Sequence, residues 1–343
     1  MKKIVLTILL AAFVHVAYCQ SISGIIKDVK GTPMPYATVY IESLKQSAVS
    51  DAGGRYVLAG LPGNGRYTLK TSYIGCHTEQ KEVVVNGNTT ADFVLKEETI
   101  TLDEFIVLPN GMDICKYVML QLDKNIKPLK KRLSSYDCRT TARLEKDIDL
   151  SEMRRRRTIR FALMLAGWGK NFDTMVKYKK LSVTMAEDVH FKKGKITNSP
   201  LQIIAMNPQM TDKEVKSFCK KDWYLDDNSY DRFYDEVHKK VKSLKSKNSK
   251  YDVKFCGSYD EGGKTIYILR YGRTQVEVVS GCWQIRRMRY KSGSRSIYFE
   301  FSELAPGVFL PISGHADFNI DYNGFPHGTV KLSLSYKYKS VKK

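Results

Sequence analysis

Two parts of the chain consist of short segments in which hydrophobic and polar positions alternate. In the N-terminal part, Ala37, Val39 and Ile41 fall on one face of an extended segment, and the same period of two recurs further along. Turn residues separate these segments about every 8–12 positions, which is typical of a β-sandwich. The sequence therefore predicts a small sandwich over residues 20–96, followed by a linker at 97–110.

A second alternating region begins near Tyr251 and favours an antiparallel sheet. Gly262-Gly263 and Asn323-Gly324 are hairpin signals, because the tightest hairpin turns need positive φ at their central positions. The expected strands are 265–270, 276–279, 283–288, 296–301, 315–321 and 329–338. We therefore expect a mostly β protein, in which the sandwich is followed by a larger, basic α+β domain over residues 111–343.

Helical periodicity is confined to a few segments. Residues 112–125 carry an apolar stripe, and either Asn110 or Asp113 is placed to cap this helix. Thr211-Asp212-Lys213-Glu214 has the form of a capping box. Another helix is expected to start near Ser229, and the spacing of its aromatic residues favours core packing over ligand binding.

The first residues have the pattern of a secretory signal. Lys2 and Lys3 precede a short apolar stretch, and the small residues Ala17 and Cys19 stand at the two positions that a signal peptidase inspects before Gln20. A lipoprotein acylated at Cys19 is the alternative. No later segment has 18 consecutive apolar residues, so no transmembrane helix is expected. We therefore predict an exported protein of the periplasm or outer membrane that begins at Gln20, after a signal peptide at 1–19.

Three segments, taken in order, carry a resemblance to a known family. SISGIIKDVKGTPMPYATVYIE, SDAGGRYVLAGLP and TSYIGCHTEQKEVVV resemble the carboxypeptidase-regulatory-like domain. This resemblance implies a transthyretin-like sandwich of about seven strands, of the kind found in Bacteroidetes envelope proteins. It implies no peptidase, because the domain is an accessory one and His77-Thr78-Glu79 lacks the His-x-x-Glu spacing of a zinc peptidase.

One motif within the resemblance has a mechanical interpretation. Asp51 is placed to hydrogen-bond the turn backbone, Gly53 and Gly54 permit positive φ, and Tyr56 returns to the core. We therefore interpret these four residues as folding residues.

The later part of the chain resembles two other groups of envelope proteins. The order of sandwich, hinge and short helix resembles the N-terminal part of a Bacteroidetes family in which an outer-membrane barrel usually follows. The strand at Trp283 and the Gly-Val-Phe-Leu-Pro segment at 307–311 resemble the curved sheet of outer-membrane lipoprotein carriers. That second resemblance implies an apolar cavity for lipid.

Charge is distributed unevenly between the two expected domains. Residues 20–98 contain 8 Lys+Arg and 8 Asp+Glu, whereas residues 99–343 contain 46 and 28. In an exported protein the available polyanions are lipid headgroups, lipopolysaccharide and acidic glycans, and nucleic acid is not expected. The arginine fork suits phosphate and sulfate, although a charge run is also typical of a solvated face. The candidate anion-binding residues are Arg154, Arg155, Arg156, Arg157, Arg286, Arg287 and Arg289.

Catalytic and metal-binding patterns are weak. The sequence has no GxSxG, HExxH or dinucleotide glycine motif, and Gly263-Lys264-Thr265 is better interpreted as a hairpin turn than as a phosphate loop. His315-x-Asp317 is a pair of alternate strand residues that two metal ligands or an acid and base would also match. The acids Asp226, Asp227 and Asp231 with Asn228 are interpreted as helix caps. Six scattered cysteines follow Cys19, and we expect mainly buried free thiols, with one C-terminal disulfide left open.

Two hypotheses about function follow. The first is a non-enzymatic binding or scaffolding protein of the envelope, without a cofactor, whose basic domain contacts a protein partner or an anionic envelope component. The second is a periplasmic carrier of lipid or lipoprotein. No enzyme is expected.

Overall fold

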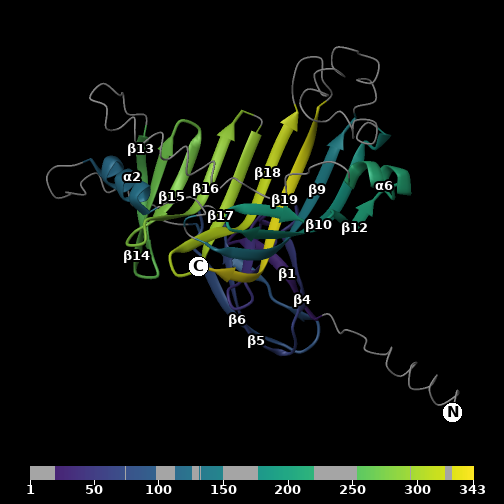
Figure 1. The fold of residues 1–343 in the computed structure, drawn as a ribbon, viewed down its shortest axis with the longest axis horizontal. Coiled ribbons are helices and arrows are strands. Elements are labelled where there is room, and N and C mark those ends of the chain that lie inside the picture. Colours follow the sequence, from purple (N-terminus) through teal and green to yellow (C-terminus); the bar gives the residue numbers. More distant parts are fainter. Residues whose placement is uncertain are drawn as a thin grey trace.

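The computed structural model describes residues 20–73, 75–97, 113–125, 131, 133–149, 177–219, 253–293, 295–320 and 327–343. The protein is mostly β, as the alternating pattern predicts (Figure 1). The N-terminal strands are β1 (Gln20–Asp28), β2 (Thr38–Ile41), β3 (Gln46–Val49), β4 (Arg55–Leu61), β5 (Gly65–Ser72), β6 (Glu79–Val85), β7 (Thr89–Thr90) and β8 (Phe93–Leu95). The later strands are β9 (Ser135–Ile148), β10 (Lys180–Lys192), β11 (Lys195–Asn198), β12 (Gln202–Asn207), β13 (Val253–Glu261), β14 (Lys264–Tyr271), β15 (Thr274–Val279), β16 (Gln284–Ser292), β17 (Arg295–Ala305), β18 (Val308–Ile320) and β19 (Gly328–Lys342).

Strands β1 to β8 form the N-terminal sandwich. One layer has the order β4-β1-β7, with β8 also paired to β1, and the other has the order β3-β2-β5-β6. The residues between the layers are apolar and almost fully buried, as the alternation along each strand requires. They include Ile22, Ile26, Val39, Ile41, Leu58, Leu69 and Leu95.

The Asp51–Tyr56 motif closes the turn before β4. Oδ1 of Asp51 accepts hydrogen bonds from the backbone N–H groups of Gly53 and Arg55, both at 2.9 Å. Only Gly54 has positive φ, at 73°, so the expectation of two left-handed glycines was too broad. Tyr56 is 2% exposed, and its hydroxyl donates to the carbonyl of Ala91 at 2.6 Å.

The later strands form one large, curved antiparallel sheet (Figure 1). Its order is β13-β14-β15-β16-β17-β18-β19-β9-β10, and β10 also pairs with β11 and β12. The hydrophobic pattern of the sequence predicts no strands at the positions of β9–β12. In β9 the buried alternate positions include Thr140 and Lys146, so apolar and polar residues do not alternate cleanly along this strand.

The two faces of the large sheet differ in chemistry. Directly paired residues on neighbouring strands share a face. One such row crosses the sheet without a polar residue and consists of Phe255, Leu269, Val276, Met288, Phe299, Gly314, Leu334, Ala142 and Met185. A row on the opposite face is mainly polar and consists of Arg270, Gln275, Arg289, Tyr298, His315, Ser333, Arg143 and Thr184.

Within the described residues, two helices accompany the sheet. Helix α2 (Ile114–Asn125) packs beside β13, and Asp113 caps it by accepting a hydrogen bond from the Cys115 N–H at 2.7 Å. Helix α6 (Asp212–Cys219) begins with the expected capping box: the Thr211 N–H donates to the Glu214 carboxylate at 2.9 Å. Neither described helix is long and apolar enough to cross a membrane.

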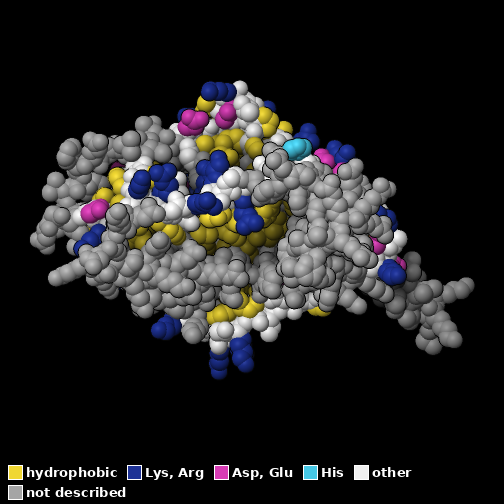
Figure 2. Space-filling model, turned by 90° about the horizontal axis from the view of Figure 1, so that it is seen from above, with side chains coloured by type: hydrophobic (Ala, Val, Ile, Leu, Met, Phe, Trp, Pro, Cys, Tyr) yellow, Lys and Arg dark blue, Asp and Glu magenta, His cyan; other side chains and the backbone are white. Residues whose placement is uncertain are grey.

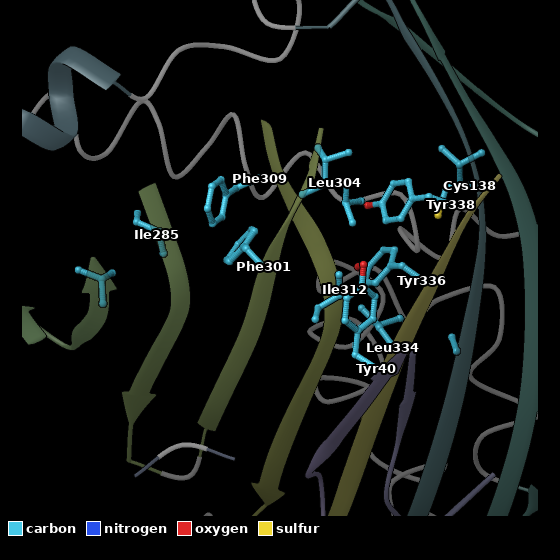
Figure 3. Packing of buried hydrophobic residues seen from close by; sticks show 14 of the residues in the cluster. Tyr40, Cys138, Ile285, Phe301, Leu304, Phe309, Ile312, Leu334, Tyr336 and Tyr338 are labelled. Carbon is cyan, nitrogen blue, oxygen red and sulfur yellow. The ribbon is translucent and has the colours of Figure 1, made fainter. Parts of the chain in front are cut away.

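The sandwich and the large sheet are joined through β19. The first half of β19 pairs with β18 as far as Ser335, and beyond that point β3 takes the place of β18 by pairing Gln46 with Lys337. Tyr40 of β2 is 4% exposed and belongs to the large sheet's hydrophobic cluster, near Ile312 and Leu334 (Figure 3). The two expected domains therefore share a continuous, buried junction.

Candidate functional site

The polar face of the large sheet carries buried charges where the sandwich covers it. Arg287 of β16 is directly paired with Glu277 of β15 and with Glu300 of β17. Its guanidinium lies 3.3 Å from Glu277 and 3.6 Å from Glu300, and the side chain is only 1% exposed. Burying this charge is tolerable because two carboxylates balance it.

A bulge brings a second arginine to the same place. The pairing of β15 with β16 shifts between Glu277 and Val278, which makes Arg286 the extra residue on its strand. Bulges re-aim side chains in this way. Arg286 Nη1 lies 2.5 Å from Glu261, and its Nε lies 3.7 Å from the Glu277 carboxylate that Arg287 also contacts.

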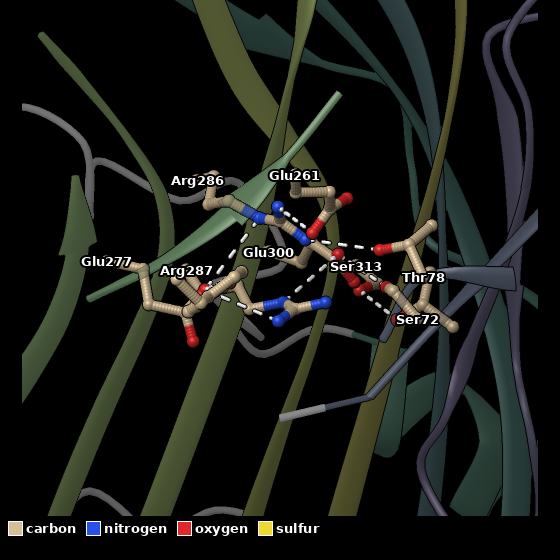
Figure 4. A network of polar contacts seen from close by, with 10 residues as sticks. Ser72, Thr78, Glu261, Glu277, Arg286, Arg287, Glu300 and Ser313 are labelled. Carbon is tan, nitrogen blue, oxygen red and sulfur yellow. Dashed lines mark hydrogen bonds and ion pairs between the residues drawn. The ribbon is translucent and has the colours of Figure 1, made fainter. Parts of the chain in front are cut away.

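The sandwich completes this ion-pair network (Figure 4). Thr78 accepts a hydrogen bond from Arg286 Nη2 at 3.2 Å, and Ser72 donates to Glu300. Beside the network, Thr38 and Ser313 share a hydrogen bond of 2.7 Å. Thr38, Ser72 and Thr78 of the sandwich therefore each pair with a polar side chain of the sheet, as buried polar groups usually do.

These contacts correct part of the anion-binding prediction. Arg286 and Arg287 are engaged by carboxylates of the protein itself, so neither guanidinium faces an external anion. The prediction rested on two consecutive arginines, which suggested a charged run on the surface. Their three partner glutamates lie on other strands, β13, β15 and β17, so the sequence alone does not display the ion pairs. The run Arg154–Arg157 lies outside the described residues, as do the acids near Asp226 and the helix near Ser229. The anion-binding prediction for Arg154–Arg157 stays a prediction.

Arg289 has a different environment. It lines a pocket of about 200 Å³ between the sandwich and the sheet, which we call the interdomain pocket. The lining residues are Pro35, Tyr36, Tyr73, Arg289, Ser296, Tyr298, His315 and Asp317. Within the described part of the chain, no carboxylate forms an ion pair with Arg289.

The pocket brings together the His315 and Asp317 pair noted in the sequence. His315 Nε2 lies 4.0 Å from Asp317 Oδ2, and the ring of Tyr36 stacks on His315 with centroids 4.6 Å apart. Burial lowers the pKa of His315 to about 4, and the charge of Arg289 acts in the same direction. The imidazole is therefore neutral at pH 7, and the described residues contain no cluster of three or more side chains suited to hold a metal ion.

Exposed lysines gather at one end of the sheet, and we call Lys192, Lys193, Lys195 and Lys342 the lysine cluster. Lys192 pairs with Lys195 across the β10–β11 hairpin, and Ser135 of β9 pairs with both Lys192 and Lys342. Lys193 occupies the hairpin turn with φ of 49°. The nearest carboxylate along β9 belongs to Asp137, which already bonds His190 at 2.7 Å and Ser340 at 2.7 Å.

The lysine cluster was not predicted from the sequence: Lys192, Lys193 and Lys195 form only a short basic run, and strand pairing across about 150 residues adds Lys342 to it. The expectation of buried thiols fits the described residues better: Cys76, Cys115 and Cys138 are buried, Cys256 and Cys282 are half-buried, and none of these five forms a disulfide. Burial raises the pKa of Cys138 to about 12, so this thiol stays protonated and inert.

Comparison with known families identifies the N-terminal part. Residues 22–107 match the model of the CarboxypepD_reg-like domain, as the resemblance implied. TonB-dependent receptor P39 of Formosa agariphila is 34% identical over 92 residues, which are 27% of this chain and 8% of the receptor. TonB-dependent receptor SusC of Bacteroides thetaiotaomicron is 28% identical over 114 residues, 32% of this chain and 11% of that receptor. The chain thus matches only about a tenth of the receptors' length.

Solved structures give weaker likenesses. A chain of a type II cohesin–X-dockerin complex from Acetivibrio cellulolyticus aligns over 31% of this chain and 73% of its own length, with 18% sequence identity and a TM-score of 0.21. A membrane-associated protein of unknown function from Bacteroides fragilis aligns over 94% of this chain and 99% of its own length, with 13% sequence identity and a TM-score of 0.19. Scores this low carry no argument about fold or function.

Proposed function

We propose that this protein, which carries a carboxypeptidase-regulatory-like domain, is an exported and non-catalytic binding protein that attaches to phosphate-bearing lipid or lipopolysaccharide of the envelope. The observation that carries this proposal is the lysine cluster. Its four ammonium groups project from neighbouring strand ends and the adjoining turn, and the nearest carboxylate along β9, that of Asp137, is already bonded. The relationship of the sandwich to TonB-dependent receptors supports an envelope-associated role.

The strength of such an attachment follows from the charges. Each basic residue near an anionic membrane surface contributes about 1 kcal/mol. Four lysines and the carboxylate of Asp137 leave a local excess of three charges, or about 3 kcal/mol, which is a difference of roughly two orders of magnitude in binding. The buried junction between the sandwich and the large sheet favours a rigid molecule. The distance between the sandwich and the lysine cluster is then fixed.

The test compares two variants of the full mature chain. In one, Lys192, Lys193, Lys195 and Lys342 are changed to Gln. In the matched control, the exposed sandwich residues Lys27, Lys30, Lys81 and Lys96 are changed to Gln, which removes the same charge from a surface that carries as many acids as bases. Each protein is sedimented with vesicles of phosphatidylglycerol and phosphatidylcholine at 50 mM salt.

We expect the cluster variant to bind roughly 100-fold more weakly than the unmodified chain. The sandwich variant should bind within a few-fold of the unmodified chain. Equal losses in both variants would mean that only net charge matters and that the cluster is not a site. Unchanged binding by the cluster variant would dispose of the proposal.

A lipid carrier is a second candidate, and the apolar face of the large sheet favours it. Met288, Phe299 and Leu332 are only partly buried against the hydrophobic cluster. Figure 2 shows hydrophobic side chains along the middle of the molecule with Lys and Arg side chains beside them. A carrier should bind a fluorescent phospholipid saturably and lose that binding in Phe299→Glu. Absence of saturable binding by the unmodified chain would remove this candidate.

A further inference from the structure

The interdomain pocket holds a cation that no described carboxylate pairs with, and it lies away from the lysine cluster. Arg289, Tyr298 and His315 are direct neighbours on β16, β17 and β18, so their side chains share one face. Tyr36 and Tyr73 of the sandwich close the pocket from the other side. The site exists only because the sandwich is docked on the sheet.

The other charges at the pocket are balanced. Asp317 is the direct cross-strand partner of Lys331 on β19, and Lys331 is in turn paired with Glu145 on β9. Glu145 has an ion pair of its own with Arg143, at 2.6 Å. His315 is neutral at pH 7 because it is buried. The pocket therefore carries one net positive charge, which belongs to Arg289.

Unused hydrogen-bonding groups also line the pocket. Tyr298 is 4% exposed, and its hydroxyl has no hydrogen-bond partner among the described residues. Oδ1 of Asp317 is likewise buried and makes no hydrogen bond of normal length to the described part of the chain, although the Tyr36 hydroxyl lies near this carboxylate. Buried polar groups are nearly always paired, so a donor and an acceptor left over in one pocket point to a ligand.

The size of the pocket limits that ligand. A volume of about 200 Å³ is below the ~300–1,000 Å³ of sites for drug-sized molecules, so it suits one ring or one residue of a larger molecule. The Tyr36 side chain is held over His315 although its backbone is strained, with φ of 65°. Such strain persists only where the surroundings fix it, and it is often found at binding sites.

We propose that the interdomain pocket binds a small hydroxylated monocarboxylate, of the sugar-acid class, with its carboxylate on Arg289 and a hydroxyl between Tyr298 and Asp317. One negative charge on the ligand matches the single unbalanced arginine, whose fork suits a carboxylate. A hydroxyl both accepts from the tyrosine and donates to the aspartate. A zwitterionic amino acid fits less well, because Lys331 already balances Asp317.

The proposal is tested by titrating the full mature chain with named probes. D-glucuronate is compared with D-glucose, which has the same ring without the carboxylate, and with L-alanine as a zwitterion. Binding is followed by calorimetry for the unmodified chain, Arg289→Gln and Tyr298→Phe. Arg295→Gln is the matched control, since this exposed arginine on β17 lies over Phe318 and does not line the pocket.

We expect glucuronate to bind at least tenfold more tightly than glucose or alanine. Arg289→Gln should abolish this preference and Tyr298→Phe should weaken glucuronate binding several-fold, while Arg295→Gln should leave it unchanged. Equal binding of glucose and glucuronate would overturn the role of Arg289, and tighter binding of alanine would overturn the ligand class. Failure of all three probes to bind at 20 mM would overturn the proposal. None of these outcomes bears on vesicle binding, so this inference and the proposed function fail independently.

Discussion

Replacing Arg287 with Met removes the most deeply buried charge of the junction. The guanidinium is 1% exposed and lies 3.3 Å from Glu277 and 3.6 Å from Glu300. Methionine fills much of the same space but leaves the buried Glu300 carboxylate without its counter-ion, and Glu277 with only the Nε of Arg286 at 3.7 Å. Removing one partner of a buried ion pair costs about 3–5 kcal/mol, so we expect the free energy of unfolding to fall by about 4 kcal/mol.

Urea denaturation followed by circular dichroism at pH 7 measures this change. For an m-value of ~3 kcal/mol/M, the midpoint should fall by roughly 1.3 M. Arg289→Met is the matched control, because it removes the same side chain from the same face of β16 without orphaning a carboxylate. Its effect should stay below about 1 kcal/mol. Protonation relieves an orphaned carboxylate, so the deficit of Arg287→Met should shrink at pH 4.5. A loss under 1 kcal/mol at pH 7 would refute the assignment of Arg287 to a buried network.

Three further predictions test other parts of the structure. Gly54→Ala should destabilise the protein by about 1–3 kcal/mol in the same urea assay, because φ is 73° and the new Cβ would lie 2.5 Å from the carbonyl oxygen of Ile26; Gly53→Ala, with nothing closer than 3.4 Å, should cost less than about 0.5 kcal/mol. His315 takes up a proton more readily when unfolded, so wild-type stability should fall by on the order of 3 kcal/mol between pH 6.5 and pH 4 relative to His315→Gln; parallel pH profiles would contradict this. Intact-mass measurement of the native protein should give a chain that begins at Gln20, whereas an acylated Cys19 would show that the lipoprotein alternative was right.

Local patterns along the chain predicted much of the fold. Alternation located the sandwich strands and most strands after residue 253, and the caps at Asp113 and Thr211 marked helix starts because capping depends on near neighbours. Strands β9 to β12 were missed, because β9 buries Thr140 and Lys146 among its apolar residues. The Lys146 ammonium is accommodated by the carbonyls of Ile148 and Tyr178, a partnership that no sequence pattern displays.

The surroundings of the arginines and the junction of the two domains depend on contacts between residues that lie far apart in the sequence, and local patterns do not predict such contacts. Arg286, Arg287 and Arg289 cannot be distinguished within the basic run of the sequence. In the structure, glutamates of other strands neutralise Arg286 and Arg287, whereas Arg289 lines the interdomain pocket. The junction through Gln46 and Lys337 joins segments almost 300 residues apart. Isolation of residues 20–96 would therefore expose Tyr40 and the polar groups that meet the sheet.

The salt dependence of vesicle binding tests the central claim most directly. The full mature chain is sedimented with phosphatidylglycerol-containing vesicles at 50 mM and at 1 M salt, where the screening length falls to about 3 Å. Attachment through the lysine cluster predicts strong binding at low salt and almost none at 1 M, with vesicles of pure phosphatidylcholine left unbound throughout. Absence of binding at 50 mM, or binding that persists at 1 M, would contradict the account.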